Sequence, residues 1–170
     1  MVSFIITAVL GIVMIFADQF TKYLVSIKIE YPYGSVNVID NFFCLSNCHN
    51  TGAAWSAFSN ATLALAIFST VLAAVILFFY VQTKPAFLKL SLALLISGAI
   101  GNVIDRFRLG YVVDFLNFYN LFGYSFPVFN VADICVCSGC IGMLIYIAFL
   151  SKKRTPFREG SLAEKLYGKL

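Results

Sequence analysis

The segment ATLALAIFSTVLAAVILFFYVQTKPAFLKLSLALLISGAIGNVIDR, residues 61–106, decides the fold. Residues 61–81 carry no charge, and residues 86–104 carry only Lys89, whose amine is expected to reach the membrane interface. A helix needs about 20 apolar residues to cross the hydrocarbon core of a bilayer. The short connection QTKPAF contains a proline that cannot continue a helix, so the segment predicts a tight hairpin of two membrane spans.

Two further apolar runs flank this hairpin. Residues 1–17 carry no charge, and the last run covers about residues 134–150. The first run lacks the basic start and the small-residue cleavage site of a secretory signal peptide, so we expect a retained helix. The four spans are expected at about residues 2–24, 61–81, 86–105 and 131–150.

The composition agrees with a membrane protein and excludes a soluble globular domain. Of the 170 residues, 61% are hydrophobic and 12% are charged, and the mean hydropathy is +0.89. The net charge of +4 is modest and the basic residues form no nucleic-acid groove, so no nucleic-acid partner is expected. We expect one membrane domain that covers residues 1–170.

The distribution of basic residues predicts the orientation. The tail after the last run holds Lys152, Lys153, Arg154, Arg158, Lys165 and Lys169. Basic flanks stay in the cytoplasm, and an even number of spans places both termini on the same side. We therefore expect a cytoplasmic tail at 151–170 and outward-facing connections at 25–60 and 106–130.

The two outer connections have different compositions. The first has β-branched and aromatic residues broken by Pro32 and Gly34, which predicts a few short strands in a small sheet. Residues 107–129 of the second hold nine aromatic residues and few charges, so we expect this segment to lie along the membrane interface. The fold class is therefore an all-α integral membrane protein with four spans, a small outward-facing β-sheet and an interfacial segment.

The five cysteines do not predict a metal site. Cys135, Cys137 and Cys140 fall within the last predicted helix, where their offsets point them to different faces. Cys44 and Cys48 lie in the first outer connection, where a disulfide is one possibility and free thiols are the other. We expect neither a metal nor an organic cofactor.

Asp114 and Asp133 are the strongest candidates for chemistry. Both belong at the outer membrane edge, and two converging carboxylates share a proton because they do not both ionise at low energy. The charged carboxylate can then activate water and the neutral one can protonate a leaving amine, as in aspartic proteases. The sequence does not assign these two roles. In the alternative, Asp133 closes a capping box with Asn130, and Asp114 is an exposed loop acid.

Other polar residues stand against the apolar helices. Asp18 and Lys22 are four residues apart, the spacing of a helical ion pair. Asp105 and Arg106 are expected to end the third helix, where an acid is disfavoured by the helix dipole and needs a partner. That partner could be Arg106 itself, Arg108 or a backbone donor. Asn102, inside the same span, also needs a hydrogen-bond partner.

Alternative functions use other residues. A Ser–Lys dyad would join Lys22 to Ser56 or Ser138, and Cys48 beside His49 is poorly placed because strand neighbours point to opposite faces. A transporter would place polar groups near the midplane and show internal repeats. A peptidase with two aspartates deep inside its spans would need acids in the middle of helices, whereas Asp105 and Asp133 stand near helix ends.

Five motifs together resemble the lipoprotein signal peptidases of bacteria. They are ADQFTK at 17–22, NTGAAWS at 50–56, SGAIGNVIDR at 97–106, GYVVDF at 110–115 and FNVADIC at 129–135. The resemblance covers essentially the whole chain. It implies a four-span aspartic endopeptidase that removes the signal peptide from diacylglyceryl-modified prolipoproteins, just before the lipidated cysteine.

The resemblance also implies roles for particular residues. Asp114 and Asp133 match the catalytic dyad. The positions that match residues shaping the site or holding substrate are Asp18, Lys22, Asn50, Gly52, Asn102, Asp105, Arg106 and Asn130. Among them, Arg106 or Lys22 could hold peptide carbonyls. The third motif departs from the family at Ser97-Gly98, and residues 44–49 are particular to this chain.

The remaining implications concern location and partners. The resemblance implies a multi-pass protein of the bacterial inner membrane, with both termini cytoplasmic and the active site at the outer, periplasmic face. The expected partners are prolipoprotein substrates and membrane lipids, with no obligate protein partner.

Overall fold

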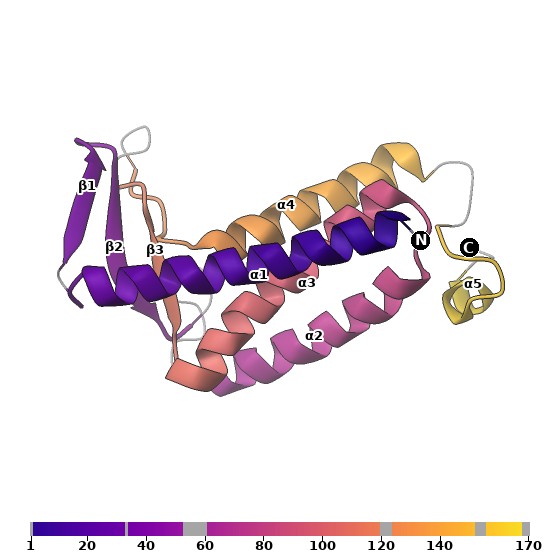
Figure 1. Ribbon diagram of the computed structural model, residues 1–170, viewed down its shortest axis with the longest axis horizontal. Helices are drawn as coiled ribbons and strands as arrows, with labels where there is room; N and C mark the ends of the chain where they lie inside the picture. Colours follow the sequence, from indigo (N-terminus) through magenta and orange to yellow (C-terminus); the bar gives the residue numbers. More distant parts are fainter. Residues whose placement is uncertain (1, 33, 53–60, 120–123, 152–155, 168–170) are drawn as a thin grey trace.

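The chain folds as a bundle of four long helices with a small sheet at one end (Figure 1). The computed structural model describes residues 2–32, 34–52, 61–119, 124–151 and 156–167. The helices are α1 (Val2–Lys28), α2 (Thr62–Gln82), α3 (Ala86–Leu109) and α4 (Val131–Ile145), which continues in a π-helical turn at Tyr146–Leu150. Within the described residues, four helices are long and apolar enough to cross a membrane. The predicted four-span fold class is confirmed.

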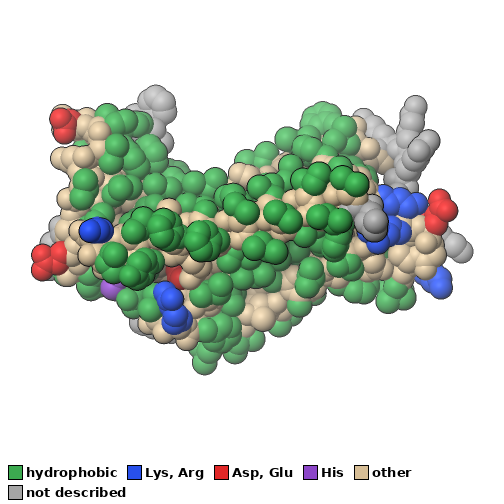
Figure 2. Space-filling model, in the orientation of Figure 1, with side chains coloured by type: hydrophobic (Ala, Val, Ile, Leu, Met, Phe, Trp, Pro, Cys, Tyr) green, Lys and Arg blue, Asp and Glu red, His purple; other side chains and the backbone are tan. Residues whose placement is uncertain are grey.

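Helix α3 is the centre of the bundle, because it packs against α1, α2 and α4 and is the most buried of the four spans. Glycines bring α3 and α4 close together: a β-carbon at Gly98 would collide with the Ala132 carbonyl, and one at Gly139 would lie 2.7 Å from Leu95. The apolar side chains that cover the middle of the molecule face outward (Figure 2). This surface is suited to lipid rather than to water.

Two helices end later than the sequence predicts. Helix α1 continues to Lys28 rather than ending near residue 24, and α3 continues to Leu109 rather than ending at residue 105. Gly110, with a φ of 80°, closes α3 in the left-handed conformation that glycine adopts without strain. Asp105 and Arg106 therefore do not end the helix as predicted. They lie in its last turns, with Asp105 fully buried.

The sheet has three antiparallel strands in the order β1 (Ser35–Ile39), β2 (Phe43–Asn50) and β3 (Val112–Asn117). The strands β1 and β2 fall in the connection where a small sheet was predicted. Residues 112–117, within the segment expected to lie along the interface, form β3, a strand that the sequence did not predict. Strand β3 pairs with β2 and places Asp114 opposite Cys48. Pairing between residues so far apart in sequence leaves no mark in the local pattern.

The two cysteines of the first connection are both free. Cys44 and Cys48 lie four residues apart on the same extended strand, β2. A strand rises about 3.3 Å per residue, so their Cα atoms are separated by roughly 13 Å, about twice the separation that a disulfide spans. The alternative of a Cys44–Cys48 disulfide is therefore excluded in this fold.

The chain returns to the bundle at the end opposite the sheet, where α1 begins and the short helix α5 (Leu162–Tyr167) lies (Figure 1). The Arg158 N–H donates to the carbonyl of Gln82, and the Lys84 N–H donates to that of Pro156, each at 2.8 Å. These bonds dock the tail on the turn between α2 and α3. Most of the basic residues predicted for the tail, Lys152, Lys153, Arg154 and Lys169, lie outside the described residues.

Candidate active site

The candidate active site lies where the sheet meets the ends of α3 and α4. Asp114 projects from β3 and is only 3% exposed. Its Oδ1 accepts a hydrogen bond of 2.6 Å from the side-chain amide of Asn130, and its Oδ2 accepts one of 2.9 Å from that of Asn50. Asp114 is thus a buried carboxylate held on both oxygens, and not the exposed loop acid of the alternative interpretation.

Asp133 lies in the first turn of α4 and closes a capping box with Asn130. The Asp133 N–H donates to Asn130 Oδ1 at 2.9 Å, and the Asn130 N–H donates to Asp133 Oδ2 at 3.1 Å. The predicted capping arrangement is confirmed. The other oxygen, Asp133 Oδ1, accepts a bond of 2.8 Å from the side-chain amide of Asn102.

Asn130 joins the two aspartates. Its side-chain amide donates to Asp114, while its side-chain oxygen and its backbone N–H bond Asp133. The same amide also donates to Asn102 Oδ1 at 3.1 Å. Because Asn130 is fully buried, this link fixes Asp114 on the sheet relative to Asp133 on the helix.

The surroundings of Asp114 favour the protonated form of its carboxyl group. Burial and then the charge of Asp133 raise the pKa of Asp114 to about 7, although the hydrogen bonds from Asn50 and Asn130 act in the opposite direction. An acid with a pKa close to neutral can hold or release a proton at the pH of most cells. Asp114 therefore has the electrostatic character required of a group in acid–base chemistry.

A buried charged layer supports this pair from within the bundle. Lys22 on α1 is 2% exposed, and its Nζ lies 2.9 Å from Asp18 Oδ2 and 2.8 Å from Asp105 Oδ2. The predicted Asp18–Lys22 pair is confirmed, and the unassigned partner of Asp105 is Lys22. The same amine donates to Asn102 Oδ1 at 2.9 Å, so its three donors are all engaged within the protein. Lys22 therefore has no donor left to hold a substrate carbonyl.

Each carboxylate of this layer also holds the backbone beside one member of the pair. Asp18 Oδ1 accepts from the Ala132 N–H at 2.8 Å, and Asp105 Oδ2 accepts from the Val113 N–H at 3.3 Å. These two residues immediately precede Asp133 and Asp114. Gln19 adds a bridge, because its side-chain amide donates to both Asp18 and Asp105. Sequence analysis missed Gln19, although it lies between Asp18 and Lys22 in the first motif.

Arg106 lies on the other side of the site, on α3. Its Nη2 donates to the carbonyl of Gly52 at 3.0 Å, and the Gly52 N–H donates to Asn50 Oδ1 at 2.9 Å. The buried Nε of Arg106 has no hydrogen-bond acceptor among the described residues. Arg106 thus holds in place the residues that follow β2.

All ten residues singled out from the sequence lie in one network of hydrogen bonds and ion pairs. The network joins Asp18, Lys22, Asn50, Gly52, Asn102, Asp105, Arg106, Asp114, Asn130 and Asp133. The rest of the second motif, residues 53–60, lies outside the described residues.

The other predicted chemistries find less support. Lys22 is too fully paired to act as the base of a Ser–Lys dyad, and Ser56 lies outside the described residues. His49 is stacked between Tyr31 and Tyr111, with ring centroids 3.7 and 3.8 Å away, so its ring is a packing element of the sheet. No group of three or more His, Cys, Asp or Glu residues in the described ranges is arranged to hold a metal ion.

The fold and the site define a class: a membrane-embedded four-helix protein with a carboxylate pair beneath a small sheet at one end. Residues 10–149 match the family model of signal peptidase (SPase) II. The chain is 44% identical over 146 residues to the lipoprotein signal peptidase of Clostridium tetani, covering 84% of this chain and 90% of that protein. It is 38% identical over 152 residues to that of Symbiobacterium thermophilum, covering 88% and 99%.

A solved structure agrees with these relatives. A bacterial membrane enzyme determined by the in meso method at 2.3 Å resolution superposes with a TM-score of 0.77 at 31% identity, covering 88% of this chain and 94% of that one. The chain therefore belongs to the signal peptidase II family of membrane peptidases.

Proposed function

We propose that this protein is an aspartic endopeptidase that removes the signal peptide from diacylglyceryl-modified bacterial prolipoproteins, cutting just before the lipidated cysteine. The observation that carries the proposal is the hydrogen bonding of both Asp114 and Asp133 to the buried Asn130. The side-chain amide of Asn130 bonds Asp114, while its side-chain oxygen and backbone N–H bond Asp133. Membership of the signal peptidase II family and the curated relatives named lipoprotein signal peptidase support the substrate class.

In the proposed reaction the two carboxylates carry one proton between them. Asp114 holds it in the resting enzyme, because burial and the neighbouring charge raise its pKa to about 7. The half-buried Asp133 accepts a proton from water as the water oxygen attacks the scissile carbonyl carbon. Asp114 then donates its proton to the leaving nitrogen as the C–N bond breaks. Proton exchange between the carboxylates restores the starting state.

The remaining residues of the network position this pair. Asn102 and Asn130 fix the carboxylate of Asp133 on both oxygens, which leaves the second lone pair of each oxygen for water. Arg106 anchors the Gly52 carbonyl through its Nη2, and its guanidinium group is proposed to hold a peptide carbonyl of the substrate as well. Asp18 and Asp105 act through the backbone beside the pair, and Lys22 acts through these two carboxylates, so none of the three touches the substrate.

The position of the site suits a lipid-anchored substrate. The acyl chains of a diacylglyceryl group stay in the bilayer, so the peptidase must present its carboxylates at the membrane edge. Asp114 and Asp133 lie at the end of the bundle, next to the sheet, rather than in the middle of the spans. We place this end at the outer face of the bacterial inner membrane and both termini in the cytoplasm.

The proposal is tested with a gel-shift assay on purified protein in detergent. The substrate is a diacylglyceryl-modified prolipoprotein, and the variants are Asp114→Asn and Asp133→Asn. Asp40→Asn is the matched control, because Asp40 is an exposed acid in the turn between β1 and β2. We expect cleavage by wild type and by the control, and loss of cleavage in both folded dyad variants.

Two outcomes would contradict the proposal in different ways. Cleavage at the wild-type rate by either dyad variant would remove that residue from the chemistry. An inert wild type on lipidated substrate, with the same protein folded by circular dichroism, would remove the substrate assignment. In that case a non-enzymatic membrane function would become the better interpretation.

A further inference from the structure

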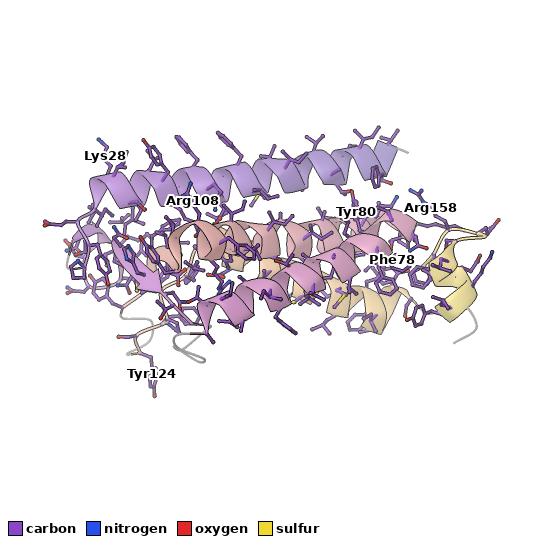
Figure 3. All side chains as sticks on the ribbon, turned by 90° about the horizontal axis from the view of Figure 1, so that it is seen from below. Lys28, Phe78, Tyr80, Arg108, Tyr124 and Arg158 are labelled. Carbon is purple, nitrogen blue, oxygen red and sulfur yellow. The ribbon has the colours of Figure 1, made fainter. Side chains whose placement is uncertain are left out.

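A cavity of about 510 Å³ opens at the end of the bundle opposite the candidate active site. Its walls come from the start of α1, the turn between α2 and α3, and the returning tail. The lining residues are Ser3, Phe4, Val81, Lys84, Lys89 and Arg158. Figure 2 shows Lys and Arg side chains gathered at this end, and Figure 3 shows Arg158 far from Lys28, which lies at the end with the sheet.

The cavity is built by specific contacts of the tail. Phe157 forms an isolated antiparallel β-bridge with the fully buried Thr83, and the Arg158 N–H donates a hydrogen bond of 2.8 Å to the Gln82 carbonyl. The Ala163 N–H donates to the Gln82 side chain at 2.9 Å, which anchors α5 on the same turn. Arg158 is therefore held at the rim of the cavity by its backbone, and its guanidinium makes no hydrogen bond or ion pair with the residues that the structure describes.

Lys89 carries the unusual feature of this cavity. The side chain was expected to extend to the interface, yet it is only 3% exposed. Its one hydrogen bond among the described residues goes to Ser3 Oγ at 3.4 Å, and its Nζ lies 6.0 Å from the centre of the Phe4 ring. Neither contact neutralises the charge of the amine.

The acidic side chains of the chain do not supply a counterion for Lys89. All eight lie within the described residues. Only Glu159 approaches the cavity, where it meets Lys84 at 3.4 Å with both side chains exposed. Glu164 accepts a hydrogen bond from the Gly160 N–H, and the remaining acids lie toward the sheet. A buried ammonium loses solvation free energy that only a counterion or strong hydrogen bonds restore.

We propose that this cavity binds the phosphate group of an anionic membrane lipid. Lys89 would lie beneath the phosphate as a point charge, and Lys84 and Arg158 would contact it from the rim. The Ser3 hydroxyl would donate a hydrogen bond to a phosphate oxygen. The apolar walls, Phe4 and Val81, are suited to the glycerol and first methylenes of a lipid. Basic pockets between spans on the cytoplasmic side are the usual sites for anionic headgroups.

The site is independent of the peptidase chemistry, so its test does not use cleavage. Delipidated protein in detergent is titrated with phosphatidylglycerol or with phosphatidylcholine of the same chains, and native mass spectrometry counts the bound lipid. Inorganic phosphate is titrated separately. The variants are Lys89→Met, which removes the charge but keeps an unbranched side chain one heavy atom shorter, and Arg158→Gln, which keeps the backbone bond to Gln82. Lys28→Gln is the control, because Lys28 is an exposed cation at the other end.

We expect phosphatidylglycerol to bind wild type and Lys28→Gln equally, and each cavity variant about tenfold more weakly. Phosphatidylcholine should bind more weakly than phosphatidylglycerol to wild type. If inorganic phosphate binds with the same dependence on Lys89, the site recognises the phosphate alone; if it does not bind, the site recognises the lipid. Equal binding of phosphatidylglycerol by wild type, Lys89→Met and Arg158→Gln would overturn the proposal. Thermal unfolding without lipid checks that both variants are folded.

Discussion

Asp18 on α1 accepts a hydrogen bond of 2.8 Å from the backbone N–H of Ala132 at the start of α4. The first N–H groups of a helix have no partner within the helix, and Asp18 supplies one from a different span. Ala132 immediately precedes Asp133. Asp105 stands in the same relation to Val113, which precedes Asp114. One buried carboxylate therefore holds the backbone beside each member of the proposed dyad.

This relationship predicts a loss of rate without a loss of substrate affinity. In Asp18→Ala the Ala132 N–H loses its acceptor, so the first turn of α4 and Asp133 shift. Displacement of a catalytic group by about 1 Å can reduce a rate about 100-fold. We expect kcat on a lipidated peptide to fall by about that factor, with KM close to wild type because Asp18 is buried beneath the pair.

The conservative variant separates positioning from charge. Asp18→Asn keeps an oxygen that can accept from Ala132 but no longer attracts Lys22, so its kcat should lie between those of wild type and Asp18→Ala. A rise in KM with kcat unchanged in Asp18→Ala would contradict the positioning role and favour contact with substrate.

Removal of Lys22 should destabilise the protein strongly. In Lys22→Met the carboxylates of Asp18 and Asp105 remain buried without their shared cation. Breaking a buried ion pair by removing one partner costs about 3–5 kcal/mol in the free energy of unfolding. The measurement is thermal unfolding in detergent, compared with Lys28→Met, which removes an exposed cation from the same helix and should change the stability by less than about 0.5 kcal/mol.

A triple variant tests the cause of this loss. Asp18→Asn, Lys22→Met and Asp105→Asn together replace the whole charged group by neutral side chains. Since such replacements are often close to neutral in stability, the triple variant should unfold at a higher temperature than Lys22→Met alone. A triple variant as unstable as Lys22→Met would show that the packing of the lysine stem, rather than its charge, stabilises the bundle.

The sequence predicted the fold where the signal was local. Uninterrupted apolar runs such as residues 61–81 indicate a span by themselves, and the observed α2, Thr62–Gln82, differs from this run by one residue at each end. Strand β3 was not predicted, because its partner strand β2 lies far away in the chain. The aromatic residues around β3 instead suggest a segment at the membrane interface. The end of α3 at Leu109 was missed because Asp105, a disfavoured acid near a helix end, is stabilised by Lys22 from another helix.

The candidate site was predictable in its membership but not in its connections. The motifs named Asp105 and Lys22 separately, and their ion pair joins residues on two helices with no spacing rule between them. The capping box of Asn130 and Asp133 was predictable because it is local. The bond from Asn130 to Asp114 was not, since it depends on where β3 returns to the bundle.

Gly101 on α3 is predicted to be essential to the charged layer. A β-carbon there would lie 2.6 Å from Asp18 Oδ2 and 3.1 Å from the β-carbon of Ala132. Asp18 cannot retreat without losing Lys22 or Ala132, so Gly101→Ala should destabilise the protein by about 1–3 kcal/mol and reduce kcat. Thermal unfolding and the cleavage assay measure the two effects.

Gly11 provides the matched control for this prediction. A β-carbon at Gly11 would meet its nearest neighbour, the Ala93 carbonyl, at 3.6 Å, which is an ordinary contact. Gly11→Ala also improves helix propensity by about 1 kcal/mol, so we expect unchanged activity and equal or higher stability. Equal effects of Gly101→Ala and Gly11→Ala would mean that helix propensity, and not the space around Asp18, decides the outcome.

The raised pKa of Asp114 predicts that the stability of wild type relative to Asp114→Asn falls as the pH rises. The pKa is about 7 in the folded protein and 3.8 in an unperturbed carboxyl, so the folded state binds the proton more tightly. The stabilisation from this proton is complete below about pH 3.8 and is lost as pH rises through about 7. Relative to Asp114→Asn, wild type should therefore lose up to about 4 kcal/mol of stability between pH 4 and 8.

The same group should limit catalysis on the alkaline side. If Asp114 donates the proton to the leaving amine, kcat should fall above an apparent pKa of about 7, which belongs to the coupled pair. The Asn50 hydrogen bond lowers the pKa of Asp114, so Asn50→Ala should move the alkaline limb to higher pH, whereas Asp40→Asn should leave it in place. The measurement is kcat from pH 5 to 9 on a lipidated peptide. A limb that is identical in wild type and in an active Asn50→Ala would assign the titration to a group other than Asp114.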